Sequence, residues 1–282
     1  MTLTFIGQEI TIYGGWFLII TGVIGGLLNV IVFLSLKTFR ESTSVFYLII
    51  ISFINIGQLL FGLFSRVMIY GFAIDWNSES LFFCKFRLTI FTLGALVSYT
   101  CLCLAIIDQY LATSVRPHWQ QLSNIKIAHY LIFIFTFIWI IHVIPYPIFF
   151  EHVISSTTGK IICTVTNQTM ALYRNYYVIL LLIGYIPCTI TVIFGILAYH
   201  NIRRIAHRTV PFVRRELDKQ LTIMVFAQVI VNLVTSLPNV TTVAVTYATA
   251  NLKDTLFLER IQFTSTVTNV MFYIYFAVRI EL

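Results

Sequence analysis

The side chains best suited to catalysis or metal binding stand apart from one another in this sequence. No serine or cysteine lies in a pattern that pairs a nucleophile with a base, and no group of His, Cys, Asp and Glu has the spacing of metal ligands. His142 lies alone in an apolar segment, where a lone histidine is most often a packed, neutral side chain. The sequence therefore predicts no enzyme, no metal site and no cofactor.

Polar but uncharged side chains, by contrast, recur inside the apolar segments. Such side chains hydrogen-bond between neighbouring helices, at about 1 kcal/mol for each bond. Asp, Glu, Lys and Arg are absent from the middle of every segment, so the segments lack the ionisable groups that proton- or cation-coupled transport uses. Prolines in the fourth, fifth and sixth segments break helix hydrogen bonds. Polar interior seams and kinks favour a bundle that switches between two packings, with these residues at the seams: Asn29, Asn55, Ser98, Asn232, Ser236, Asn239, Ser265 and Asn269.

The five cysteines fall into two groups. Cys101, Cys103 and Cys188 lie inside apolar segments, where cysteine is usually a small packing residue. Cys84 and Cys163 lie at or beyond the segment ends on the side assigned below to the outside, which is the oxidising side of a membrane. A disulfide between them would tie the start of the third segment to a long outer connection.

Long apolar segments must position all these side chains. The chain is 59% hydrophobic and only 10% charged, whereas a soluble domain carries about 25% charged residues. Seven stretches of 18 residues or more contain no charged residue, and a membrane-spanning helix needs about 20 apolar residues. Soluble enzymes, nucleic-acid binders and secreted disulfide scaffolds are excluded. We expect an all-α membrane protein, one seven-helix domain over residues 1–282, with spans of roughly 11–36, 43–70, 82–108, 127–150, 174–202, 219–248 and 256–278.

The basic residues predict the orientation of this bundle. With seven spans, the side of the N-terminus carries 7 basic and 6 acidic residues, and the other side carries 11 basic and 5 acidic residues. Because an excess of Lys and Arg marks the cytoplasmic side, we expect the N-terminus outside and the C-terminus inside. The sequon at Asn167 then falls in an outer connection, where glycosylation occurs. We expect a multi-pass protein of the plasma membrane whose basic inner surface contacts anionic lipids or an acidic partner.

Several short motifs follow one another along the spans. Cys84 lies 25 residues before Gln109. The others are Asn29 after Gly25-Gly26, the triplet Asp108-Gln109-Tyr110, Trp139, Pro187, Pro238 and the segment from Asn269 to Tyr273. In order and spacing, over all seven spans, this set resembles the rhodopsin-like (class A) G-protein-coupled receptors. In that family the triplet reads Asp-Arg-Tyr and the last segment reads Asn-Pro-x-x-Tyr. The chain is more similar to divergent orphan receptors of invertebrates than to aminergic or peptide receptors.

The resemblance implies which residues couple to a G protein and switch the bundle. Gln109 replaces an arginine that pairs, in the family's inactive state, with acids including one on the sixth helix, at the position of Asp218. A glutamine hydrogen-bonds but cannot form that charge-assisted lock, so we expect Asp108 to pair with a nearby basic group. Val270 replaces the family's proline, so we expect a straighter seventh helix. The implied coupling and switch residues are Asp108, Gln109, Tyr110, Asp218, Asn269 and Tyr273.

The resemblance also implies an interior polar network and an outer ligand pocket. The network residues are Asn29, Asn55, Ser98 and Ser265, and because Asn55 replaces an aspartate that binds sodium in the family, we expect no sodium modulation. The pocket residues are Arg66, Phe91, Thr92, Asn239, Tyr247 and Glu259. Phe91 stands where amine receptors carry an aspartate, which argues against a monoamine ligand. Arg66 and Glu259 either grip a polar ligand group or else snorkel or pair with each other, and both alternatives are open.

The sequence thus predicts a receptor that binds an extracellular ligand and biases a two-state bundle toward a heterotrimeric G protein. Its expected partners are that ligand, the G protein and membrane lipids, with no nucleic acid and no cofactor. Two alternatives are open. A small transporter or channel would show ligand-independent flux, and a receptor-like scaffold or decoy that has lost coupling is favoured by Gln109.

Overall fold

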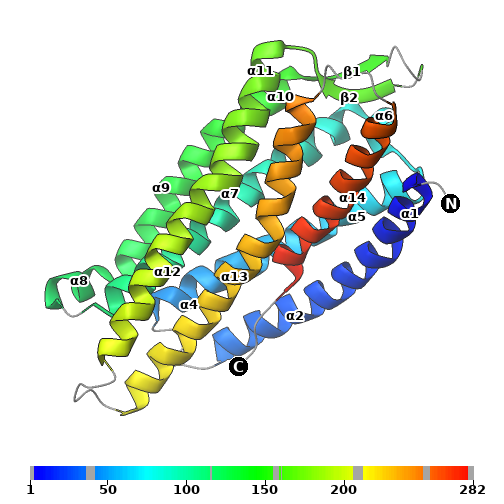
Figure 1. Cartoon of the computed structure of the whole chain (residues 1–282). Coiled ribbons are helices and arrows are strands. Elements are labelled where there is room, and N and C mark those ends of the chain that lie inside the picture. The colour runs from blue at the N-terminus through cyan, green and yellow to red at the C-terminus, as the bar shows by residue number, and fades with distance from the viewer. Residues whose placement is uncertain are drawn as a thin grey trace.

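A computed structural model describes most of the chain as one bundle of long helices (Figure 1). The described residues are 3–35, 42–114, 116–154, 159, 161–205, 212–249 and 255–278, and their side chains are described except at 202–205, 212–219, 255 and 256.

Six of the described helical segments are long and apolar enough to cross a membrane. They run over Leu3–Ser35, Thr43–Gly71, Leu81–Ala112, Ile125–Phe149, Gln168–Asn201 and Gln220–Ala248. Because the hydrocarbon core offers no hydrogen-bond partners, the backbone must satisfy its own polar groups there, and a helix does so within one segment. The described chain is therefore an all-α, multi-pass membrane protein.

Several spans combine α-helix with stretches of the wider π-helix. The first consists of α1 (Leu3–Glu9), η1 (Ile10–Gly14) and α2 (Gly15–Ser35), and the second of α4 (Thr43–Gly57), η2 (Gln58–Leu63), α5 (Phe64–Arg66) and η3 (Val67–Gly71). The third is the single helix α7 (Leu81–Ala112), and the fourth is α9 (Ile125–Val143) with α10 (Pro145–Phe149). The fifth consists of α11 (Gln168–Leu172), η4 (Tyr173–Tyr185) and α12 (Ile186–Ile205), and the sixth lies within α13 (Phe212–Ala248).

A seventh long helix, α14 (Thr255–Ala277), packs against α13 and α2. Its 23 residues are enough to cross a bilayer by length. Several Thr residues together with Gln262 and Asn269 make it less apolar than the six spans above. The seventh span therefore remains a prediction from the sequence.

One end of the bundle carries a small β-hairpin that the sequence did not predict. Strands β1 (Phe150–Ile154) and β2 (Ile161–Val165) pair antiparallel, with His152 opposite Cys163. The short helix α6 (Trp76–Glu79) and the start of α7 lie at the same end (Figure 1). We call this end the hairpin end; the short helix α8 (Pro117–Leu122) and the last turn of α7 lie at the opposite end.

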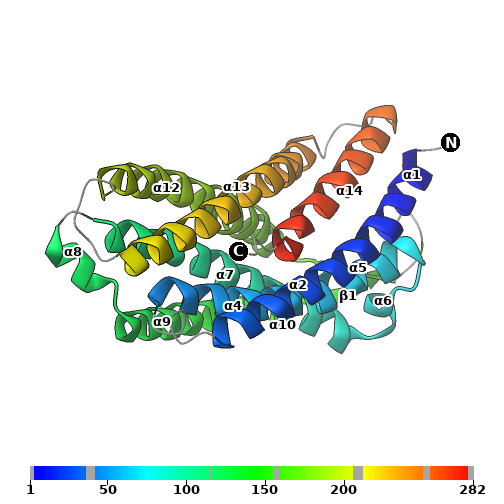
Figure 2. The same cartoon turned by 90° about the horizontal axis from the view of Figure 1, so that it is seen from below.

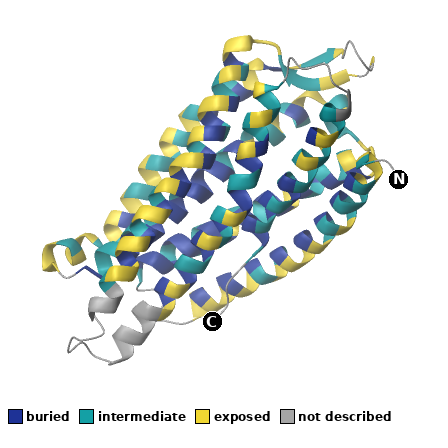
Figure 3. Ribbon diagram, in the orientation of Figure 1, coloured by how far each residue is buried: buried dark blue, intermediate teal, exposed yellow. Residues whose placement is uncertain are grey.

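Helix α7 occupies the centre of the bundle. Figure 2 shows α12, α13 and α14 on one side and α2, α4 and α9 on the other, with α7 between them. The buried residues face inward and the exposed ones outward (Figure 3). On α9 large apolar side chains such as Phe133, which is 72% exposed, face outward, as expected for a surface in contact with lipid.

Polar side chains determine where several helices begin. The Asn124 side-chain oxygen accepts a hydrogen bond from the backbone N–H of Lys126, which caps α9. Ser80 caps α7 in the same way, through the N–H of Phe83. Each cap satisfies a backbone N–H in the first turn of its helix, at the N-terminal end of α7 or α9.

Candidate functional site

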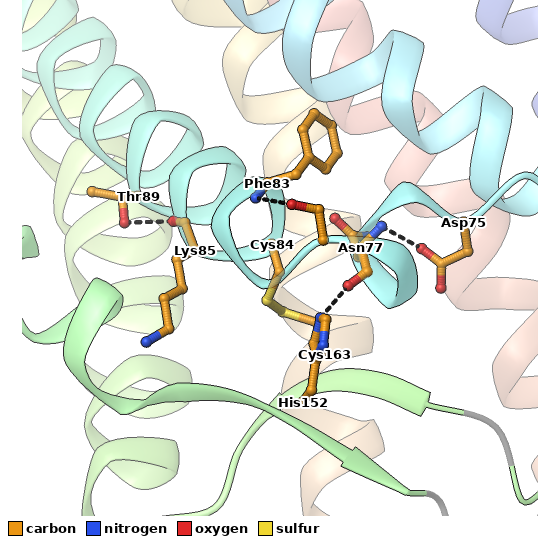
Figure 4. Close-up of a disulfide and its surroundings, with 9 residues drawn as sticks. Asp75, Asn77, Phe83, Cys84, Lys85, Thr89, His152 and Cys163 are labelled. Atoms are coloured by element: carbon orange, nitrogen blue, oxygen red, sulfur yellow. Dashed lines mark hydrogen bonds between the residues drawn. A yellow bond between two sulfur atoms is a disulfide. The ribbon is translucent and has the colours of Figure 1, made fainter.

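The predicted disulfide is confirmed at the hairpin end. Cys84 and Cys163 are bonded, with their Cα atoms 6.1 Å apart and a sequence separation of 79 (Figure 4). His152, opposite Cys163 in the hairpin, donates from its Nε2 to the Asn77 carbonyl oxygen at 2.6 Å. The bridge and this hydrogen bond fasten the hairpin to the start of α7 and to α6.

The predicted outer-pocket residues fall into two groups near the hairpin end. In the first, the Phe91 ring lies 6.1 Å from the ring of Tyr273 on α14, and the charge of Arg66 acts on the Tyr273 hydroxyl. Within the described residues, no ion pair joins Arg66 to Glu259, which lies half-buried at the start of α14.

The second group lies across the bundle, toward η4 and α13. Thr92 of α7 and Tyr146 of α10 are both buried and lie near each other. The Tyr247 ring lies 6.2 Å from that of Tyr176. Asn239 is buried on α13, one turn beyond Ser236.

The sequence analysis missed Arg87 as a member of the first group. Its Nε donates to the Ser65 hydroxyl at 2.5 Å, which joins α7 to α5. Its charge also acts on the hydroxyls of Tyr70 and Tyr273. A basic residue inside the third predicted span, one turn after the bridging Cys84, is the signal that identifies it.

Two hydrogen-bonded chains cross the middle of the bundle from adjacent residues of α7. In one, Ser98 donates to the Asn55 side-chain oxygen at 2.7 Å and its hydroxyl lies 3.3 Å from that of Tyr275. Because the single Ser98 hydrogen goes to Asn55, Tyr275 must be the donor of the second bond. This chain links α4, α7 and α14, and Asn55 and Ser98 are two of the four network residues that the resemblance implied.

The second chain runs from α7 to α13. The Tyr99 hydroxyl lies 3.0 Å from that of Ser236, which donates to the Asn232 side-chain oxygen at 2.8 Å. Tyr99 is therefore the donor to Ser236. The ring of Tyr99 also stacks on that of Tyr275, with centroids 4.7 Å apart and planes 8° from parallel, so the two chains touch.

The other two predicted network residues lie outside these chains. Asn29 lines a cavity of about 20 Å³ between α2, α4 and α13, together with Ser52 and Gln228. That volume is about enough for one water molecule. Ser265 lies half-buried on α14 and makes no side-chain hydrogen bond within the described residues.

The predicted switch triplet lies at the opposite end of α7, and its first two side chains are buried. The Asp108 carboxylate accepts a hydrogen bond from the Ser44 hydroxyl of α4 at 2.5 Å. The expected pairing of Asp108 with a basic group stays a prediction. Asp108 also lines a cavity of about 40 Å³ between α4, α7 and α9. The Tyr110 ring packs edge-on against Trp119 and Phe194.

Gln109 connects the third helix to the sixth. Its side-chain oxygen accepts a hydrogen bond from the Thr222 hydroxyl on α13 at 2.8 Å, and both residues are buried. The predicted partner of the family arginine, Asp218, lies one turn before Thr222, and its side chain is outside the described residues. The third and sixth helices are thus joined here by a neutral hydrogen bond.

The structure does not bring Asn269 and Tyr273 near this triplet. Tyr273 lies beside Phe91 and the α-carbon of Gly62, nearer the hairpin end than Ser98 is. On α14 it is Tyr275 that joins the interior network. The Asn269 side-chain oxygen is buried without a hydrogen-bond partner.

Comparisons with known proteins do not identify a family for this chain. The chain matches no protein-family model and no curated protein sequence. Within the described residues, no group of three or more His, Cys, Asp and Glu is placed to hold a metal ion.

Proposed function

We propose that the chain is a divergent rhodopsin-like G-protein-coupled receptor of the plasma membrane, with seven spans and the hairpin end outside. The observation that carries the proposal is the hydrogen bond between Gln109 and Thr222. It joins the third and sixth helices at the position where the resemblance implies the family's arginine lock. An extracellular ligand acts at the hairpin end, and a heterotrimeric G protein engages the opposite end.

The hydrogen bond between Gln109 and Thr222 is weak enough for a ligand to shift the bundle between two states. A neutral hydrogen bond between membrane helices contributes about 0.6 kcal/mol on average, and at most about 1.7 kcal/mol. A charge-assisted bond is roughly twice as strong as a neutral one. A bond of about 1 kcal/mol biases a two-state equilibrium about fivefold, which a ligand can readily overcome.

The disulfide supports the proposed orientation. A bond between Cys84 and Cys163 forms and persists in an oxidising compartment, such as the secretory lumen and the cell exterior. The excess of basic residues on the other side of the predicted topology is typical of the cytoplasmic face. Phe91 at the hairpin end supplies no counter-ion, so the proposed ligand is not a monoamine.

The test is basal G-protein activation in cells, measured at matched surface expression. We compare the wild type with Thr222→Val, which removes the hydroxyl but keeps the size of the side chain. The control is Thr235→Val, because the Thr235 hydroxyl bonds to the Val231 carbonyl of its own helix. We expect Thr222→Val to raise basal activation several-fold above the wild type and Thr235→Val to leave it unchanged.

A second arm replaces Gln109 with arginine, as the family has. If the wild type is silent and Gln109→Arg activates a G protein, the chain is a receptor whose coupling the glutamine has reduced. If every variant is silent at full surface expression, the receptor-like scaffold is the better account. Ion or solute flux in cells that express the wild type, with no added ligand, would instead support a transporter or channel.

A further inference from the structure

Two arginines lie inside the second and third spans, close to the hairpin end. Arg66 lies in the span Thr43–Gly71 and Arg87 in the span Leu81–Ala112, and both are half-buried. A charged side chain within a span is costly unless it is partnered, and such residues are commonly functional. The partners of the two guanidinium groups therefore indicate whether this pair has a function.

Each guanidinium has donors with no acceptor among the residues that the structure describes. Arg87 donates from Nε to the Ser65 hydroxyl, whose own hydrogen is donated to the Phe61 carbonyl oxygen. The Arg66 guanidinium lies over the ring of Tyr70, with Cζ 4.7 Å from the ring centroid. Its Nε is buried and has no hydrogen-bond acceptor.

In the part of the chain that the structure describes, neither positive charge is paired with an acidic group. Within the described residues, no ion pair joins Arg66 or Arg87 to a carboxylate. Asp75 lies near Arg87, and one of its carboxylate oxygens accepts the N–H of Asn77 at the start of α6. Ser65, which accepts the hydrogen bond from Arg87, directly precedes Arg66 in the chain, so the two positive charges lie in one neighbourhood.

The surroundings of the pair are aromatic. The buried Tyr273 lies within the field of both arginines, and its ring lies 6.1 Å from that of Phe91. Gly62 lies between these rings, and a Cβ atom there would come within 2.8 Å of Phe91 and 3.3 Å of the Tyr273 hydroxyl. Positive charge next to aromatic rings suits a molecule with one anionic end and one apolar end.

We propose that Arg66 and Arg87 bind the carboxylate of a small amphipathic organic acid, whose apolar part packs against Phe91 and Tyr273. The proposal rests on the proposed receptor function and specifies the chemical class of its ligand. A guanidinium matches a carboxylate with two parallel N–H donors. A carboxylate would also supply the acceptor that the Arg66 Nε lacks, and it is a stronger partner for that charge than the Tyr70 ring.

The test measures thermal unfolding of the purified full chain in detergent. Cys101, Cys103 and Cys188 are free and buried, so a thiol-reactive fluorogenic dye reports their exposure on unfolding. The probes are 3-phenylpropionate and hexanoate, each compared with its neutral amide, and inorganic phosphate. We expect at least one acid to raise the unfolding temperature by about 3–5 °C at roughly ten times its Kd, and its amide to have no effect.

The variants locate the effect. Arg66→Gln and Arg87→Gln should each abolish the shift, and Arg87→Lys, which keeps the charge but loses the planar fork, should weaken it. The control is Arg174→Gln, because Arg174 also lies at the hairpin end over an aromatic ring, with its Cζ 5.5 Å from the Phe150 centroid. Arg174→Gln should keep the full shift.

Three outcomes with the organic acids would overturn the proposal. They are equal shifts for acids and amides, a shift that survives in both Arg→Gln variants, and no shift with any acid on the wild type. A shift with phosphate alone would also overturn it, since it would assign the site to a different anion. The acid–amide comparison uses the wild type, so it holds even where a variant fails to fold.

The same preparation separates this proposal from the receptor function. If the acids bind but neither the wild type nor Gln109→Arg activates a G protein with the acid present, the site stands and the receptor function fails. If basal activation responds to Thr222→Val while no acid shifts unfolding, the receptor function stands and the carboxylate site fails.

Discussion

The hydrogen bond from Tyr99 to Ser236 allows a quantitative test of how α7 is held to α13. Tyr99→Phe removes only the hydroxyl, because the phenylalanine ring can still stack on Tyr275. Ser236→Ala removes two bonds, the one that it accepts from Tyr99 and the one that it donates to Asn232. The two single variants and their double variant form a double-mutant cycle.

The magnitude follows from the geometry. At 3.0 Å and fully buried, the bond should contribute near the upper part of the range for membrane proteins, about 1 kcal/mol. Tyr99→Phe should then lower the unfolding temperature by about 2–4 °C. Ser236→Ala should lower it more, and the double variant should be no worse than Ser236→Ala by more than about 0.5 kcal/mol.

The assay is dye-detected thermal unfolding in detergent, at a single protein concentration for all variants. Tyr110→Phe is the matched control, because the Tyr110 ring packs on Trp119 but its hydroxyl makes no hydrogen bond within the described residues. Strictly additive losses from Tyr99→Phe and Ser236→Ala would refute the bond. So would a loss from Tyr110→Phe as large as that from Tyr99→Phe.

Three other predictions concern the hairpin end and the packing of the first span. Cys84→Ser should sharply reduce surface expression, measured by flow cytometry, because it unfastens the hairpin from α7. Asn167→Gln should remove one glycan and increase gel mobility, because Asn167 is exposed and precedes Thr169 by two residues. Gly22→Ala should destabilise the bundle by about 1–3 kcal/mol in thermal unfolding, because its Cβ would come within 2.8 Å of the Ala277 backbone.

Each of these has a control in the same chain. Cys188→Ser removes a free buried cysteine and should leave surface expression near that of the wild type. A wild type whose gel mobility does not respond to glycosidase would argue against the sequon. Gly57→Ala adds a Cβ with no atom within 4 Å, so it should be neutral or stabilising. Equal losses from the two glycine variants would contradict the packing described around Gly22.

Features that depend on composition were predicted well from the sequence. Long apolar stretches can satisfy their backbone in lipid only as helices, so the all-α membrane class followed directly. The disulfide followed because only Cys84 and Cys163 lie at or beyond the outer ends of the apolar segments. The hairpin did not, because strands β1 and β2 are short and lack the alternation that marks a half-buried strand.

Features that depend on axial register were harder to predict. Tyr273 and Tyr275 differ by two residues, and a helix rotates by about 200° over that distance. Only the packing against α7 shows that Tyr275 faces Ser98 while Tyr273 faces Phe91. Motif spacing alone cannot resolve such a choice, because it does not show how α14 is rotated against α7.

Two hydrogen bonds between α7 and α13 lie at very different distances from Pro238. Ser236 lies about 3 Å from the proline along the helix axis, whereas Thr222 lies about 24 Å away. A rotation of about 10° at the proline would therefore move Ser236 by about 0.5 Å but Thr222 by about 4 Å. The first displacement preserves a hydrogen bond and the second breaks one. The Tyr99–Ser236 bond, close to the proline, would thus persist during such a rotation. The bond between Gln109 and Thr222 would break first.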